Sequence, residues 1–176
     1  MLYSALIISM VMFSGCGYTT KSLLPADMKA VYVDNFKNSI RITAEQNNER
    51  MYRGYTPGME IELTKAVIDR FLLDGNLKIA SEKEANIIMN GNLIDFRREP
   101  LRYDANDNIE EYRITITVNL ELEDAKTGNA LWKENGFTGE TTYTTSGALA
   151  KGENAAVRDA ISDLARRIVE RTIEAW

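Results

Sequence analysis

The chain has 176 residues, of which 44% are hydrophobic and 27% are charged, and its formal net charge is −5. This length suits one domain with a hydrophobic core, and the negative charge argues against a nucleic-acid binder, which needs a basic face. The sequence contains no histidine, so it lacks the usual general base and the commonest metal ligand. Composition therefore predicts a non-enzymatic protein without a metal or cofactor.

The first predicted element is a lipoprotein signal peptide over residues 1–15. Residues 2–13 form an almost unbroken apolar run, which Ser14, Gly15 and Cys16 follow. Twelve helical residues span about 18 Å, which is too short for the ~30 Å hydrocarbon core of a bilayer but normal for a signal peptide. The sequence FSGC resembles a lipobox, which implies that Cys16 is acylated. The alternative is a buried N-terminal helix with an incidental cysteine.

The residues after the cysteine are expected to form a membrane tether. Gly17 follows the cysteine, where an Asp would retain such lipoproteins at the inner membrane, so Gly17 favours the periplasmic side of the outer membrane. Residues 16–28 show no hydrophobic periodicity and are predicted to be this lipidated tether. Several acyl chains, each contributing about 0.8 kcal/mol per buried CH₂, would anchor it stably. Residues 29–176 are predicted to form a single α+β domain.

The first half of that domain is predicted to consist of a strand, a helix and a second strand. Residues 29–36 are rich in β-branched and aromatic side chains and are predicted to be a strand. Residues 37–58 are polar and are expected to form a long loop, with a short extra strand around 40–43. Apolar residues at the spacing of one helix face predict a helix over 59–73. A second strand is predicted over 77–80, so the order favours a right-handed βαβ unit.

The second half is predicted to be three strands and a helix. Residues 85–98 form the first of these strands, and Gly91 in its middle indicates a bulge or close packing. From 112 to 122 every even residue is apolar and every odd residue polar, so one face should meet a core and the other water or a partner. A further strand follows over 130–143, then an amphipathic helix over 153–174. The order β-α-β-β-β-β-α predicts an α+β fold, with both helices on one face of a mostly antiparallel sheet of about four to five strands.

Several segments recur in a characteristic order along the mature chain. They are CGY at 16–18, LP at 24–25, VYVDNFKN at 31–38, EIELTKAVIDRF at 60–71, ANIIMNGNLIDF at 85–96, EYRITITVNLELEDAKTGNALW at 111–132 and DLARRIV at 163–169. No single segment is specific, but the ordered set resembles the LptE family of lipopolysaccharide-assembly lipoproteins.

The resemblance implies a role rather than a reaction. Members of this family sit as a plug inside the outer-membrane barrel LptD, assist its assembly and help to deliver lipopolysaccharide to the outer leaflet. A small polar-surfaced domain can fill a polar lumen, and the candidate surface for the barrel is the set of odd residues Arg113, Thr115, Thr117 and Asn119. The alternative for these residues is plain solvent exposure. The alternative function is activation of a peptidoglycan synthase, and a periplasmic hydrolase is a third reading.

Lipopolysaccharide carries phosphates that need cations. Arg97, Arg98 and Arg102 lie between two predicted strands, and arginine suits phosphate because its planar fork donates two hydrogen bonds. By resemblance, a lysine that ends an ALAK sequence before the last helix contacts lipopolysaccharide, and here it is Lys151. The family also has an arginine near the position of Asp104, where this chain has no basic residue, so Arg102 is the nearest substitute. The alternative is that these arginines lie on a solvent-exposed rim and bind no ligand.

Overall fold

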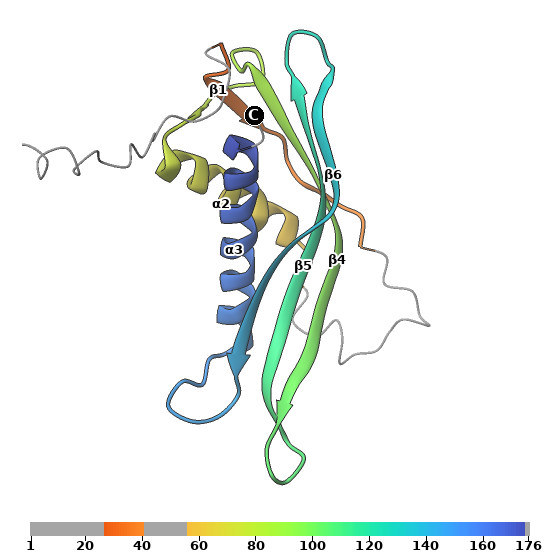
Figure 1. Cartoon of the computed structure of the whole chain (residues 1–176), viewed down its shortest axis with the longest axis vertical. Helices are drawn as coiled ribbons and strands as arrows, with labels where there is room; N and C mark the ends of the chain where they lie inside the picture. The colour runs from red at the N-terminus through yellow and green to blue at the C-terminus, as the bar shows by residue number, and fades with distance from the viewer. Residues whose placement is uncertain (1–26, 41–55, 175–176) are drawn as a thin grey trace, which may run out of the picture.

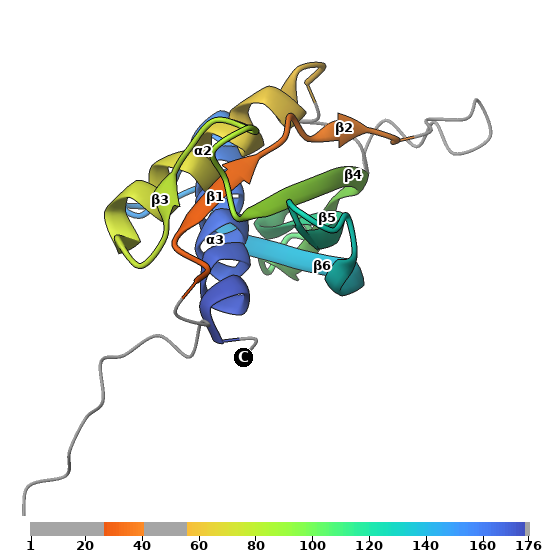
Figure 2. The ribbon, with the colours of Figure 1, turned by 90° about the horizontal axis from the view of Figure 1, so that it is seen from above.

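A six-stranded sheet with two helices on one of its faces makes up the part of the chain that the computed structural model describes, residues 27–40 and 56–174 (Figures 1 and 2). The elements are β1 (Ala30–Val33), β2 (Lys37–Asn38), α2 (Met59–Asp74), β3 (Lys78–Ile79), β4 (Ile87–Tyr103), β5 (Ile109–Asp124), β6 (Ala130–Thr144) and α3 (Glu153–Glu174). The predicted signal peptide and Cys16 lie outside the described residues. Within those residues, no helix is long and apolar enough to cross a membrane.

The sheet is mixed, whereas the sequence predicted a mostly antiparallel one. Its order is β3-β1-β4-β5-β6, with β2 also paired to β4. The strands β1, β2 and β3 form parallel pairs, and only β4–β5 and β5–β6 are antiparallel. Connectivity explains the difference, because a crossover helix such as α2 returns the chain in the same direction while hairpins reverse it. The α+β class and the two helices on one face are confirmed.

The strand β5 has the alternation that the sequence predicted. Its even residues Ile114, Ile116, Val118, Leu120 and Leu122 are buried, and the odd residues between them are partly exposed. The buried side faces α3, which packs on β5 and β6 and also against α2. At Gly139 of β6, an added Cβ would lie 2.4 Å from the Cβ of Leu164. Glycine there lets the backbone of α3 approach the sheet directly.

Both helices begin and end close to their predicted limits. In α2 the predicted face is buried through Leu63, Val67 and Phe71. This helix ends at Gly75, whose φ of 76° is left-handed and whose N–H donates to the carbonyl of Phe71 at 3.0 Å. A glycine stop of this kind satisfies a carbonyl that the helix itself leaves unpaired.

The strand β4 is longer than predicted and changes its inward face partway along. It was expected to end at Arg98 but continues to Tyr103. Pro100 is tolerated because beyond Leu93 the described residues pair with β4 on one side only, and proline is accepted at such an edge. A bulge directly after Leu93 shifts burial from odd residues to Phe96 and Arg98.

Close packing at the start of the sheet fixes the path between β1 and β2. An added Cβ at Gly91 would lie 2.1 Å from the ring of Phe36, so the close approach that Gly91 indicated is confirmed. A short strand lies at Lys37–Asn38. The extra strand expected around 40–43 falls mostly on residues 41–43, which lie outside the described ranges.

The strand β6 is the last strand of the sheet, and its outer edge is held by the chain itself. The carboxylate of Asp163 on α3 accepts the N–H of Glu140 at 3.1 Å. Further along, Thr144 forms a parallel bridge with Ala150 in the loop that leads to α3. The helix and this loop therefore fix β6 from its unpaired side.

Replacing Ile116 with Asp should destabilise the domain, because an unpaired charge would enter the core where Ile116 has no exposed surface. We expect the free energy of unfolding to fall by on the order of 4 kcal/mol. The matched variant Thr115→Asp puts the same charge on the opposite face, next to Arg97, and should change it by less than about 1 kcal/mol. Urea unfolding compares the two, and equal midpoints would contradict the register of β5.

Candidate functional site: an open polar sheet face and the loops at one end

The face of the sheet opposite the helices is polar along β4, β5 and β6. The predicted interface residues Arg113, Thr115, Thr117 and Asn119 all lie on it, at partly exposed positions of β5. Arg97 lies on the same face, because it is the cross-strand partner of Thr115 and follows the bulge in β4. The structure therefore brings one predicted phosphate ligand together with the predicted partner surface.

Three ion pairs lie on this face. The pairs are Arg97 with Asp95 at 2.7 Å, Arg113 with Glu140 at 3.9 Å and Lys133 with Glu121 at 2.5 Å. The hydrogen bond to the Glu121 carboxylate raises the pKa of Lys133. Between the pairs lie threonine and asparagine side chains, so the face offers hydrogen bonds alongside its paired charges.

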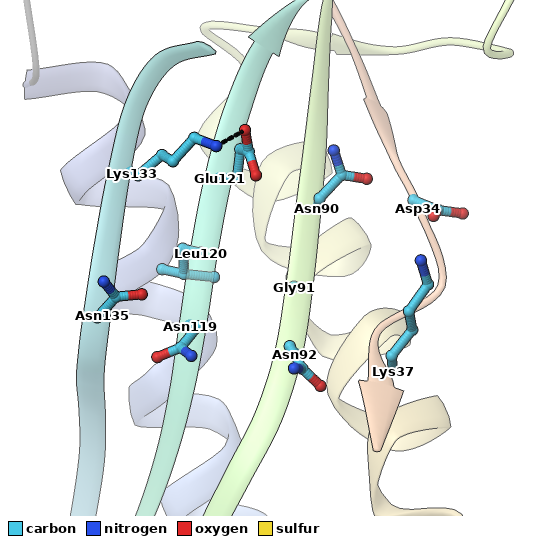
Figure 3. Close-up of a pocket in the computed structure, with 10 residues that line it drawn as sticks. All are labelled: Asp34, Lys37, Asn90, Gly91, Asn92, Asn119, Leu120, Glu121, Lys133 and Asn135. Carbon is cyan, nitrogen blue, oxygen red and sulfur yellow. Dashed lines mark ion pairs between the residues drawn. The ribbon is translucent and has the colours of Figure 1, made fainter. Parts of the chain in front are cut away.

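One part of this face is hollowed to a volume of about 300 Å³ (Figure 3). It is lined by Asp34, Lys37, Asn90, Gly91, Asn92, Asn119, Leu120, Glu121, Lys133 and Asn135. Sequence reasoning found only Asn119 among them. The others come from distant segments, and only the pairing of the strands brings them together.

The β4–β5 turn and the β6–α3 loop lie at the same end of the molecule, as the green turn and the blue loop at the bottom of Figure 1 show. The N–H of Thr145 donates to the carbonyl of Glu110 at 2.9 Å, and its hydroxyl donates to the carbonyl of Ile109 at 2.9 Å. Two of the predicted phosphate ligands therefore share this end, with Arg102 near the end of β4 and Lys151 in the loop before α3.

Both of these cations are exposed and paired with carboxylates. Arg102 lies 3.2 Å from Glu110 and 3.7 Å from Glu111, and Lys151 pairs with Asp159. Exposed ion pairs contribute only about 0–1 kcal/mol. A phosphate that offers more acceptor oxygens can therefore replace these carboxylate partners.

Apolar side chains lie at the same end and were missed in the sequence. Leu149 is 86% exposed, Tyr103 54% and Leu101 42%. The signal for them was present as apolar residues on either side of Arg102 and before Lys151. Together with the cations, they give this end the amphipathic character that a phosphorylated lipid presents.

Arg98, in contrast, is buried on the helix side, with only 5% of its side chain exposed. Its Nη1 donates to Glu153 at 2.9 Å, and its guanidinium lies 4.3 Å from the ring centroid of Tyr112. That ring stacks on Tyr143, whose pKa is raised by burial. Arg98 thus links the sheet to the first residue of α3, shortly after Lys151, and is not presented to a ligand in solvent.

The acidic turn between β4 and β5 is ordered by its own hydrogen bonds. The carboxylate of Asp104 accepts N–H groups of Asn106 and Asn108 at 2.8 and 2.9 Å. The side-chain hydrogen bond from Asn108, followed by these backbone bonds, lowers the pKa of Asp104. In the described ranges, no group of three or more His, Cys, Asp or Glu residues is placed to hold a metal ion.

A family model described as lipopolysaccharide-assembly, LptE, matches residues 28–172. The chain belongs to the LptE family. The membership that the ordered segments indicated is thereby confirmed, and the family's role is lipopolysaccharide assembly rather than catalysis. No curated protein matches the LptE chain by sequence.

Solved structures share the fold of this LptE chain. An uncharacterized lipoprotein B from Nitrosomonas europaea matches with a TM-score of 0.54 and 13% identity, over 85% of this chain and 84% of that one. A hypothetical protein from Chlamydia trachomatis gives 0.52 and 11%, over 82% and 95%. A protein from Xanthomonas campestris gives 0.51 and 13%, over 85% and 88%. At these identities, the likeness shows the fold alone.

Arg98→Ala should destabilise the protein by about 3–5 kcal/mol, because it leaves the Glu153 carboxylate without its cation. The matched variant Arg97→Ala removes an exposed arginine, whose side chain is 54% exposed, and should change stability by less than about 0.5 kcal/mol. Thermal or urea unfolding measures both. Equal losses would show that the buried pair does not hold α3 to the sheet.

Proposed function

We propose that this LptE-family chain is a non-enzymatic outer-membrane lipoprotein on the periplasmic side, which plugs an LptD-type barrel and assists its assembly. In that position it would help to move lipopolysaccharide to the outer leaflet and would contact it directly. Family membership supports the assembly role. The observation that supports the plug role is the open polar face of β4, β5 and β6.

A one-sided sheet suits a barrel lumen for a physical reason. The helices remove the apolar face from water, and the face that remains is lined with threonine, asparagine and paired charges such as Arg113 with Glu140. The lumen wall of a large barrel is polar, so contact there needs hydrogen-bond complementarity and little net charge. The four residues from Arg113 to Asn119 are central to this surface.

We place the lipopolysaccharide contact in this proposal at the end of the molecule where Arg102 of β4 and Lys151 of the loop before α3 lie. Exposed cations at this end would meet phosphate groups, and Leu149 with Tyr103 would meet the apolar chains. Arg97 on the sheet face is the other exposed cation of β4. Burial removes Arg98 from this set and assigns it to holding the loop in place.

The membrane attachment is proposed to be lipid on Cys16, with residues 1–15 as the signal peptide and 16–28 as the tether. The described chain starts at the end of the molecule away from the Lys151 loop (Figure 1). The anchor and the proposed lipopolysaccharide contact therefore attach to opposite ends of the domain.

Cys16→Ala should abolish acylation and leave unprocessed precursor, because the acylated cysteine is the proposed first residue of the mature protein. Mass spectrometry of the membrane and soluble fractions measures the acyl mass and the cleavage. Normal membrane retention with an unchanged mass would rule out lipidation at this residue. Cysteine occurs only at this position, so no other cysteine can substitute.

Lys151→Ala should weaken lipopolysaccharide binding by about fivefold, and Lys151→Asp by more, because the second change adds repulsion. Asp159→Asn should strengthen binding, since it frees Lys151 from its carboxylate partner. Lys126→Asp, which makes the same change of charge in the turn at the opposite end, is the matched control. Titrations at two salt concentrations should show weaker binding at high salt. Binding that is unchanged by salt and by the three variants at Lys151 and Asp159 would place the contact elsewhere.

Capture of the barrel tests the plug itself. Affinity purification from detergent-solubilised envelopes should recover a large outer-membrane barrel, and bulky changes such as Thr117→Arg should reduce its recovery without changing the melting temperature. Recovery of a peptidoglycan synthase instead of a barrel would contradict the proposal. Full recovery with every open-face variant would show that the barrel binds another surface.

A further inference from the structure

The hollow on the open face is built by an irregularity on each side of the β4–β5 pair. On the β4 side, the ring of Phe36 fills the space beneath Gly91, and the chain leaves β4 between β1 and β2. Asp34 lies just after β1 and Lys37 at the start of β2, and both side chains stand at the rim of the hollow, as Figure 3 shows.

The second irregularity is in the β5–β6 pair. The register shifts between Val118 and Leu120, so Asn119 has no residue directly opposite it on β6. Its Oδ1 instead accepts the N–H of Gly136 at 3.0 Å, and Gly136 has a left-handed φ of 72°. This bond fixes the amide plane of Asn119, with its two N–H donors available to the hollow.

Amide side chains dominate the hollow. Asn90 and Asn92 of β4, Asn119 of β5 and Asn135 of β6 line it from three adjacent strands (Figure 3). Asn92 and Asn119 are direct cross-strand partners. Asn92 lines the hollow, and its Oδ1 atom is buried without a hydrogen-bond partner among the described residues, so an unsatisfied acceptor lies next to the hollow.

The charges of the hollow balance. Lys133 is held by Glu121 at 2.5 Å, while Lys37 and Asp34 stand on the other rim with no ion pair among the described residues. An anion entering the hollow would meet both carboxylates, and a cation would meet both ammonium groups. An apolar ligand would leave the amides unpaired. A neutral ligand rich in hydroxyl groups meets none of these penalties.

We propose that this hollow binds a single neutral sugar ring. Each hydroxyl both donates and accepts, as each asparagine amide does, and the two charged residues at either rim add further donors and acceptors. The volume of about 300 Å³ lies at the small end of ligand pockets, which suits one ring rather than a long ligand. The lining contains no aromatic side chain, so binding is by hydrogen bonds and a Kd of roughly 1 mM is expected.

The source of the sugar rests on the proposed function, under which lipopolysaccharide passes this surface and presents its saccharide. The hollow would then hold the sugar part while the Arg102 and Lys151 end holds the phosphates. This assignment separates saccharide recognition from phosphate recognition on one protein.

The test is a titration of the acylated full chain, labelled with ¹⁵N, in zwitterionic micelles that carry no sugar head group. The probes are glucose, the dephosphorylated core oligosaccharide released from lipopolysaccharide, and inorganic phosphate. Glucose and the oligosaccharide should shift the side-chain amide signals of Asn92, Asn119 and Asn135 in a saturable way, and phosphate should not. Absence of saturable shifts with both saccharides, or an equal response to phosphate, would overturn the site.

Two variants connect the response to the hollow. Asn92→Ala and Asn135→Ala should each weaken saccharide binding at least fivefold. Asn92→Ala should leave the melting temperature unchanged, because its Oδ1 has no partner to lose. Asn154→Ala, which removes an exposed amide on α3 outside the hollow, is the matched control and should bind as the parent does. Saccharide binding that survives both asparagine variants contradicts the proposal.

The same variants separate this site from the plug role. Barrel capture that persists without any saccharide response leaves the proposed function standing and removes the sugar site. A saccharide response without barrel capture leaves the sugar site standing and contradicts the proposed plug function. If Asn135→Ala reduces barrel capture while no saccharide binds, the hollow receives a side chain of the barrel and the sugar proposal is wrong.

Discussion

The direct packing of α3 onto the sheet at Gly139 is the contact on which the rest of the structure depends. The backbone of α3 approaches β6 as closely as a glycine allows, since a Cβ would lie 2.4 Å from Leu164. Around this contact the even residues of β5 are enclosed, and α2 packs alongside α3. Because both helices occupy one side, most polar side chains of the long strands lie on the other, with Arg98 as an exception that bonds α3. A one-sided sheet of this kind must meet either water or a partner.

The regular parts of this fold were predictable because their signals are periodic. The alternation in β5 and the helical spacing before Gly75 each repeat over many residues, so one irregular position does not hide them. The bulge after Leu93 has no such signal, because one added residue leaves the composition unchanged. It nevertheless decides that Arg97 faces outward and Arg98 inward. The parallel pairing of β1 with β3 agrees with the βαβ unit that the sequence predicted. The pairing of β1 with β4 was missed because four residues are too few to show which strand lies beside them.

The candidate site was predictable only where a resemblance or a single strand pointed to it. Lys151 came from the ALAK sequence, and the interface residues came from one face of β5. That the loops of Arg102 and Lys151 meet depends on backbone bonds such as Thr145 to Glu110. The hollow depends on strand pairing across four separate segments. Contacts of this kind are set by the tertiary structure, so no local pattern reports them.

The bonds on the outer edge of β6 have a consequence for how this protein can associate. An exposed edge strand invites another chain to extend the sheet, which leads to aggregation or uncontrolled polymers. Here Asp163 already occupies the N–H of Glu140, and Ala150 already pairs with Thr144. Along this part of β6, a second strand could add only by displacing α3 and its loop, which also close the core. Association is thereby directed to side-chain recognition across the broad face, where the choice of partner is set by chemistry and not by the backbone that all proteins share.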